Sequence, residues 1–269
     1  MELNQIVNAA GLVLFALSSG MFVHALQRRT DGLPLFKTAL AALGGGTVAS
    51  AWMVLQKGST IGWNQVSGHM LAATLGLLSL LAFLRFKVRP IGAFTAPLAT
   101  LILLLQFFAA PIPMPAAGAA GSGLIYVHIV MAILGQTFAI GACAVSVLYL
   151  WQRNALKKRQ LDLIPAQVPA MDKLDKLLVR FVWTGFIFIT LSLISGAVFV
   201  QSFQLSAAPS LQAKVIWAIA VWVWYLAILI FRNVLNHPGR RVAQMSLGGF
   251  FLLAISYFGM AFFRPFGGG

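Results

Sequence analysis

Residues 124–139, LIYVHIVMAILGQTFA, are apolar enough to lie inside a membrane, yet they contain one ionisable side chain, that of His128. They belong to an apolar run over residues 123–151, and a helix needs about 20 such residues to cross the hydrocarbon core of a bilayer. Because an ionisable group is costly inside a membrane, His128 is a candidate functional residue. This stretch therefore indicates both the fold class and the first place to look for a site.

Similar apolar runs recur along the whole chain. Of its 269 residues, 60% are hydrophobic and 9% are charged, which excludes an ordinary soluble domain. Eight runs are long enough to predict membrane spans, at about residues 3–26, 36–55, 67–86, 91–110, 123–151, 178–202, 211–232 and 242–263. The fourth run is the weakest helix because Pro97 interrupts it. We therefore predict an all-α polytopic transmembrane helix bundle that forms a single domain over residues 1–269.

The basic residues indicate which way the bundle crosses the membrane. A net charge of +14 would suit a nucleic-acid-binding protein, but 16 of the 19 Lys and Arg fall in alternate loops. The exceptions are Lys57, Lys214 and Arg264. Such asymmetry is typical of the cytoplasmic loops of multi-pass membrane proteins, here predicted in the bacterial inner membrane. Both termini are then expected on the outer, periplasmic side, and no nucleic-acid partner is expected.

The longest cytoplasmic connection covers residues 152–177 and is strongly basic. It leads into the sequence MDKLDKLLVRF, in which one helical face is apolar. The residues of this face are Met171, Leu174, Leu177 and Leu178. The pattern predicts an interfacial amphipathic helix before the sixth span. A solvated basic loop close to anionic lipid headgroups would explain the charges equally well.

Few residues offer catalytic chemistry. The five acidic residues lie near a terminus or in cytoplasmic loops, at Glu2, Asp31, Asp162, Asp172 and Asp175. A proton-coupled pump usually needs acidic groups at mid-membrane, and hydrolysis needs a carboxylate pair or a set of Ser, His and Asp. We therefore expect no enzymatic activity. The lone Cys143 excludes an internal disulfide, and without a C-x-x-C-H motif any bound haem would be non-covalent.

Two of the four histidines are stronger candidates than the others. His237 belongs to a cytoplasmic loop, and His24 lies at the cytoplasmic end of the first span, where lipid headgroups can solvate it. His69 and His128 open the third and fifth spans, which both start on the outer side. Their imidazoles should therefore lie at a similar depth near the outer face. Two neutral imidazoles can ligate a haem iron from opposite sides, and interhelical hydrogen bonding is the alternative.

Small residues follow each of these two histidines at helical spacing. After His128 they are Ala132, Gly135, Ala139 and Ala142, and after His69 they are Ala73, Gly76 and Ser79. Such stripes let helices approach closely, or they leave room for a flat ring. Trp63 and Tyr126 lie near the two histidines, where they either wall a cofactor or form part of the outer aromatic belt.

Several segments in the second half of the chain form a specific combination. They are YVHIVMAILGQ, SVLYLWQRNALKKRQ, VPAMDKLDKLLVRFVWTGFIFITLSLISGA, AKVIWAIAVWVWY and PGRRVAQMSLGGFFLLAISYFG. In this combination the chain resembles the CcsA-type cytochrome c assembly family, particularly its short eight-helix branch, which includes the HemX-like and YpjD-like membrane proteins. The first half of the chain resembles the family in outline.

The resemblance implies a membrane protein that handles b-type haem at the outer face, with histidines as axial ligands. His128 stands at the family's helix-opening histidine, whereas His69 is our geometric choice for the opposite ligand. Full cytochrome c assembly members carry W-D-P-K-E before the seventh span. The corresponding residues here are Leu211, Gln212, Ala213, Lys214 and Val215. Only Lys214 and later aromatic residues are retained, which favours a haem-binding accessory, or a relative that serves another process, over a complete haem-to-cytochrome ligase.

The leading hypothesis is therefore an integral membrane protein that holds haem b for haem handling or cytochrome c biogenesis. The expected haem-binding residues are His128, His69, Trp63, Tyr126 and Lys214. The expected partners are membrane lipid, haem and other cytochrome c assembly or membrane proteins. The alternative is a cofactor-free scaffold or regulator that docks a partner through its basic cytoplasmic loop. A metal or small-solute transporter is a third hypothesis, for which the spans offer a scattered polar path.

Overall fold

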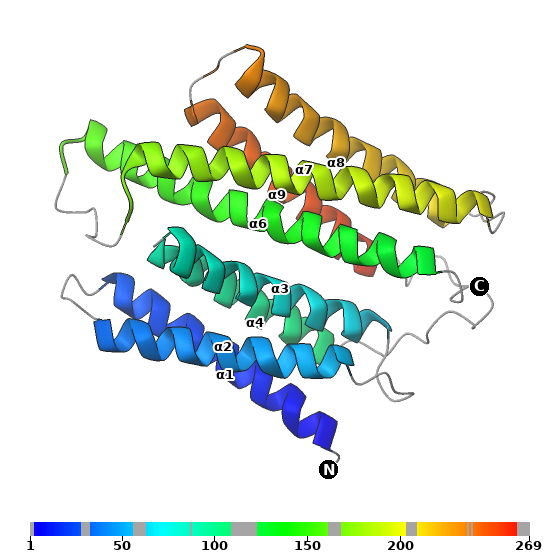
Figure 1. Ribbon diagram of the computed structural model, residues 1–269, viewed down its shortest axis with the longest axis horizontal. Coiled ribbons are helices and arrows are strands. Elements are labelled where there is room, and N and C mark those ends of the chain that lie inside the picture. The colour runs from blue at the N-terminus through cyan, green and yellow to red at the C-terminus, as the bar shows by residue number, and fades with distance from the viewer. Residues whose placement is uncertain are drawn as a thin grey trace. The chain divides into compact units, whose positions relative to one another are not determined.

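The computed structural model describes residues 3–27, 33–55, 63–86, 88–108, 123–160, 168–202, 209–235, 237 and 239–262. Within these ranges all regular structure is helical, as Figure 1 shows. The α-helices are α1 (Leu3–Gln27), α2 (Leu33–Leu55), α3 (Trp63–Phe86), α4 (Gly92–Phe108), α6 (Gly123–Lys157), α7 (Met171–Ser202), α8 (Pro209–Asn233) and α9 (Gly239–Phe262). A short 3-10 turn, η1 (Arg89–Ile91), precedes α4. The predicted all-α polytopic bundle is confirmed.

Six of the described helices are long and apolar enough to cross a membrane, namely α1, α2, α3, α6, α7 and α8. The apolar helix α4 is shorter, at 17 residues, and it continues through Pro97. A proline removes one backbone donor, which membrane helices tolerate where neighbouring groups satisfy the freed carbonyl. The prediction of eight spans therefore requires that α4 and α9 also cross the membrane, in addition to these six helices.

The helices on either side of the basic connection are longer than the predicted spans. Helix α6 continues through Lys157 and ends where Arg159 adopts a positive φ of 56°. The amide of Gln160 then donates to the carbonyl of Ala155, as in a Schellman cap. On the other side, MDKLDKLL forms the first two turns of α7, a continuous helix of 32 residues. Whether those turns lie at the membrane interface stays a prediction.

The chain, treated above as a single domain, divides into two compact units. The first contains Met1–Ala116 and Gln152–Met171, and the second contains Ala117–Trp151 and Asp172–Gly269. Helices α1 to α4 therefore form the first unit. Helix α6, as far as Trp151, forms the second unit together with α7, α8 and α9.

In the first unit, α1 and α3 each pack against both α2 and α4. The hydroxyl of Ser18 on α1 donates to the carbonyl of Ala39 on α2 at 2.9 Å. Between α2 and α3 the approach is closest at Gly76, where an added Cβ would lie 1.9 Å from Oγ1 of Thr47. A side chain at this position would therefore force Thr47 to move, and glycine lets α2 and α3 approach closely.

In the second unit, consecutive helices pack through aromatic and small residues. An added Cβ at Gly135 of α6 would lie 2.8 Å from Cγ1 of Ile189 on α7. The indole of Trp222 on α8 donates to Oγ1 of Thr190 on α7 at 2.9 Å. Trp224 of α8 donates to the carbonyl of Met245 on α9, also at 2.9 Å. Both of these part-buried indole donors are thereby satisfied across a helix interface.

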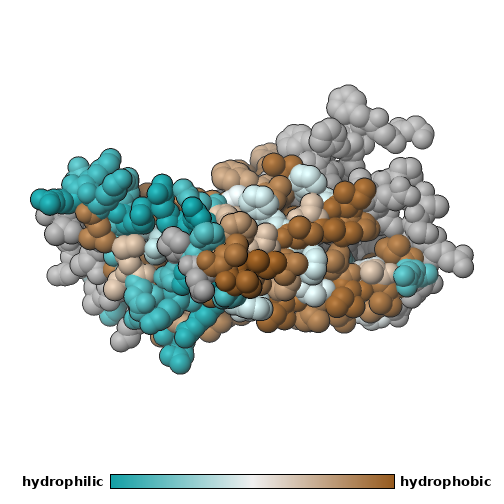
Figure 2. All heavy atoms as spheres, turned by 90° about the horizontal axis from the view of Figure 1, so that it is seen from above, coloured by the Kyte–Doolittle hydropathy of each residue, from teal (hydrophilic) through white to brown (hydrophobic). Residues whose placement is uncertain are grey.

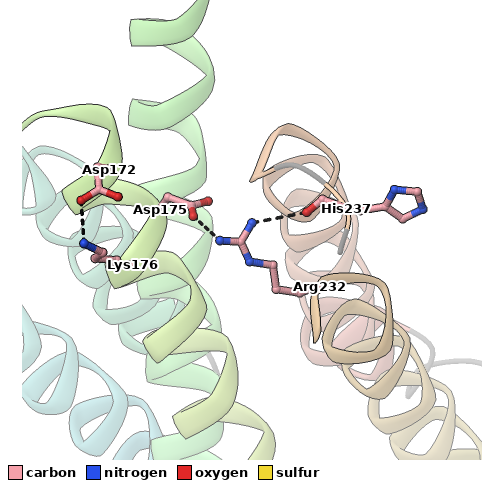
Figure 3. Close-up of polar contacts among 5 residues, drawn as sticks. All are labelled: Asp172, Asp175, Lys176, Arg232 and His237. Atoms are coloured by element: carbon pink, nitrogen blue, oxygen red, sulfur yellow. Dashed lines mark hydrogen bonds and ion pairs between the residues drawn. The ribbon is translucent and has the colours of Figure 1, made fainter. Parts of the chain in front are cut away.

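One end of the second unit carries charged side chains. Figure 3 shows Arg232, from the last turn of α8, between Asp175 of α7 and the backbone of His237. Its guanidinium forms an ion pair with Asp175 and donates to the carbonyl of His237 at 3.3 Å. In Figure 2, hydrophilic side chains gather at one end of the visible face, and hydrophobic side chains cover much of the remainder. This separation suits helices whose apolar surfaces face lipid.

Candidate haem-ligand site

His128 lies one turn into α6 and packs against α7. Its Nδ1 is 2.7 Å from the backbone carbonyl oxygen of Ser192. The hydroxyl oxygen of Ser192 is 3.3 Å from the same nitrogen and donates to the backbone carbonyl of His128 at 3.3 Å. The imidazole is half-buried and is therefore fixed to the neighbouring helix on one side.

The partner of Nδ1 determines which ring nitrogen carries the proton. A carbonyl oxygen can only accept a hydrogen bond, so Nδ1 of His128 must be the donor. In a neutral imidazole the other nitrogen, Nε2, then has a free lone pair. Among the residues that the structure describes, no hydrogen bond reaches Nε2 of His128. This is the arrangement that a histidine needs in order to act as a metal ligand through Nε2.

Gly196 makes this contact sterically possible. It lies one turn beyond Ser192 on α7, and an added Cβ would be 2.8 Å from both Nδ1 and Cε1 of His128. Real Cβ atoms essentially never approach other heavy atoms so closely, so the imidazole would have to move. The absence of a side chain at Gly196 therefore allows His128 to lie directly against the α7 backbone.

His69, on α3, has a different environment. Its side chain is 2% exposed, and within the described part of the chain its buried Nδ1 has no hydrogen-bond partner. The preceding Gly68 lies against α4, where an added Cβ would be 2.6 Å from Cγ of Gln106. A buried polar nitrogen without a partner is unusual and needs an explanation such as a water or ligand. Both candidate histidines thus have a ring nitrogen that these residues leave unused.

The small-residue stripes after the two histidines serve helix packing. Gly135, below His128, is covered by Ile189 of α7, and Gly76, below His69, is covered by Thr47 of α2. Ser79 hydrogen-bonds to Thr95 of α4. Of the two alternatives open from the sequence, the described residues favour close helix approach at these positions. The case for a haem ligand therefore rests on the imidazoles themselves.

The remaining predicted residues are placed as follows. Tyr126 is 46% exposed on the first turn of α6, and Lys214 is exposed on α8. Trp63 is the first residue of α3, but its side chain lies outside the part that the structure describes. His69 and Trp63 belong to the first unit, whereas His128, Tyr126 and Lys214 belong to the second. The pairing of His69 with His128 stays a prediction.

Sequence reasoning missed three residues on α7 and α8. Ser192 and Gly196 were part of an otherwise ordinary apolar run, although their spacing of one helical turn puts a small pair on one face. Trp217 is one of the aromatic residues that follow Lys214 in the sequence, and the sequence assigned it no role. Its indole Nε1 is buried without a hydrogen-bond partner in the described residues, unlike those of Trp222 and Trp224.

The model of one protein family, described as cytochrome C assembly protein, matches residues 63–266. This match covers most of the chain and includes α3, α4 and all four helices of the second unit. No solved structure matches the chain significantly.

Curated relatives named cytochrome c biogenesis protein CcsA are also similar to this chain. The protein from Prochlorococcus marinus (strain NATL1A) is 31% identical over 115 residues, which are 43% of this chain and 35% of the relative. The one from Prochlorococcus marinus (strain MIT 9312) is 34% identical over 98 residues, 36% of this chain and 31% of the relative. That from Synechococcus sp. (strain RCC307) is 32% identical over 95 residues, with 35% and 30% covered. Each match thus spans about a third of the relative's length.

Proposed function

Because this chain belongs to the cytochrome c assembly protein family, we propose that it binds b-type haem non-covalently, with His128 as an axial ligand. It is a multi-pass membrane protein of that family. We place it in the bacterial inner membrane, where it handles haem at the outer face or takes part in cytochrome c biogenesis. The curated relatives carry the name cytochrome c biogenesis protein, which supports the same process here.

The single observation that carries the proposal is the contact of His128 with Ser192. The proton on Nδ1 is held by a carbonyl at 2.7 Å, so the lone pair of Nε2 is available to iron. Haem ligands are commonly oriented in this way, by a hydrogen bond from the other ring nitrogen. The bound group would supply an iron centre for haem transfer or redox chemistry, and this chain would bind and orient it.

His69 is the proposed opposite ligand. Its buried Nδ1 has no partner in the described residues, and a neutral buried imidazole is suited to iron. Tyr126, Trp63 and Lys214 are proposed to contact the periphery of the haem. Lys214 is the retained lysine of the region where the family carries W-D-P-K-E. With the rest of that pattern replaced, a role as haem-binding accessory is favoured over complete ligation of haem to a cytochrome.

The test is the visible spectrum of the full-length protein purified in detergent, both oxidised and reduced. We expect a Soret band and a low-spin, bis-histidine spectrum for the wild type. His128→Ala and His69→Ala should lose the band or become high-spin, because each removes one axial ligand. His237→Ala is the control, since this histidine contacts Arg241 at the charged end of the second unit.

A wild-type preparation that stays colourless after haem is added would defeat the proposal. The cofactor-free scaffold would then be the better hypothesis. Lys157, Lys158 and Arg159, which are exposed at the end of α6, would be the residues to replace while co-purifying partners are followed.

A further inference from the structure

Ser192 of α7 contacts both the ring and the backbone of His128 on α6. The carbonyl of Ser192 holds Nδ1 at 2.7 Å, and the hydroxyl of the same residue donates back to the carbonyl of His128. Two groups of one residue thus bind both the ring and the backbone of the histidine. The bond to Nδ1 holds the orientation of the ring, and the bond to the backbone holds α6 against α7 at the same level.

Gly196, on the same face of α7, leaves room for the imidazole in this position. With an added Cβ only 2.8 Å from two ring atoms, the imidazole could not keep its present distance from the Ser192 carbonyl. The serine provides the acceptor, and the glycine provides the room. Both residues come from one helical face of α7, one turn apart.

We propose that Ser192 and Gly196 are positioning residues that hold neutral His128 in the tautomer protonated on Nδ1, with Nε2 as the ligand atom. A neutral imidazole in water favours the opposite tautomer, so the α7 backbone is what selects this one. Donation from Nδ1 to a carbonyl also makes Nε2 a stronger electron donor. That Nε2 binds haem iron rests on the proposed function, whereas the tautomer of His128 does not depend on it.

The first test needs no haem. The full-length protein is prepared haem-free in detergent with ¹⁵N-labelled histidine, and the His128 signals are assigned by their loss in His128→Ala. The nitrogen chemical shifts distinguish a protonated from an unprotonated ring nitrogen. We expect wild-type His128, at a pH where it is neutral, to be protonated on Nδ1. Protonation on Nε2 in the wild type would overturn the inference, whatever any variant does.

Gly196→Ala tests the steric half of the arrangement. It should shift the tautomer population toward Nε2–H by about fivefold or more, which corresponds to the loss of one hydrogen bond. The matched control is Gly185→Ala on the same helix, where an added Cβ would lie 3.4 Å from Cβ of Phe138, an ordinary contact. Ser192→Ala keeps the carbonyl and should therefore keep the tautomer. An unchanged tautomer in Gly196→Ala would contradict the role of the glycine.

The second readout uses added haem. If His128 is a ligand, Gly196→Ala should bind haem about tenfold more weakly and have a higher reduction potential, because the ligand becomes a poorer donor. Gly185→Ala should match the wild type in both. A wild type with the Nδ1–H tautomer that binds no haem would refute the proposed function but leave the positioning of His128 intact. Equal haem affinity and potential in the two glycine variants would show that the positioning has no effect on ligation.

Discussion

Trp217 is the indole whose environment differs from that of its neighbours on α8. Trp222 and Trp224 each donate to a partner at 2.9 Å, whereas buried Nε1 of Trp217 has no acceptor among the described residues. Trp222 is level with Thr190 of α7, to which it donates. Trp217 precedes Trp222 by five residues and so lies about 7.5 Å nearer the start of α8. Because α7 runs antiparallel to α8, the same distance along α7 leads from Thr190 to near Gly196. A buried donor at the level of His128 is suited to an acceptor that a ligand supplies, such as a haem carboxylate.

Replacing this tryptophan separates ligand binding from packing. Trp217→Phe keeps an aromatic ring but removes the N–H, and we expect haem affinity to fall about fivefold, the effect of one hydrogen bond. Thermal stability of the haem-free protein should not fall by the same amount, because no partner among the described residues is lost. Trp222→Phe is the matched control and should lose about 1 kcal/mol of stability with its bond to Thr190. Haem titration and thermal unfolding measure the two effects. Unchanged haem affinity in Trp217→Phe would rule out the donor role.

Two ion pairs at the start of α7 differ in their surroundings. The side chains of Asp172 and Lys176 are 77% and 67% exposed, and they pair along the same helix. Asp175 and Arg232 are 20% and 26% exposed, and they join α7 to α8. The same carboxylate lies beside Gly239, at the start of α9, where an added Cβ would be 2.1 Å from its Oδ1. The second pair therefore joins two helices and lies against the start of a third, whereas the first lies within a single helix.

This difference predicts unequal effects on stability. Arg232→Met should destabilise the protein by about 2 kcal/mol, because it leaves Asp175 partly buried without its counter-ion. Lys176→Met is the matched control and should change stability by less than about 0.5 kcal/mol, as is usual for an exposed pair. Adding Asp175→Asn to Arg232→Met should recover part of the loss, since no unpaired charge then remains. Thermal unfolding in detergent measures all three. Equal losses for the two single variants would contradict the assignment.

The second unit combines an apolar surface with charges at one end. Lys173 lies in the first turn of α7, and Arg240 and Arg241 lie in the first turn of α9. Arg232 lies in the last turn of α8, so all of these cations occur where α7 and α9 begin and α8 ends. A membrane protein with such a distribution keeps its positive end on the cytoplasmic side. The orientation of the chain is a prediction from this rule.

Thiol labelling tests the orientation. Cys143→Ala removes the only cysteine, and single cysteines are then introduced at exposed positions. Gly123→Cys and Lys214→Cys should react with a membrane-impermeant maleimide in intact spheroplasts, because both positions are predicted to be outside. Lys173→Cys and Arg240→Cys should react only after the membrane is permeabilised. The reverse pattern would invert the topology and place His128 near the cytoplasmic face.

Most of the helical architecture could be predicted from composition and apolar run length. Residues that cross a bilayer must satisfy their backbone hydrogen bonds internally, so a run of about 20 apolar residues indicates a helix without any knowledge of its neighbours. The run before Gln152 and the run after Leu177 were both found in this way. Run length alone ends the first of these segments at residue 151 and begins the second at residue 178, because the polar turns at the end of α6 and the start of α7 are helical without being apolar. The helical start of α7 was predicted instead from the amphipathic pattern of MDKLDKLLVRF.

The sequence by itself determined the class of the molecule, its helices and the choice of His128 as a residue that needs a role. The tertiary structure alone decided what surrounds that residue. Ser192 lies 64 positions away and supplies the acceptor for Nδ1, and Gly196 leaves the space for the ring. Hydropathy and helical spacing are properties of one segment, so they identify a face of a helix. Which two faces meet depends on packing between helices, and it is this packing that leaves Nε2 of His128 as the nitrogen available to a ligand.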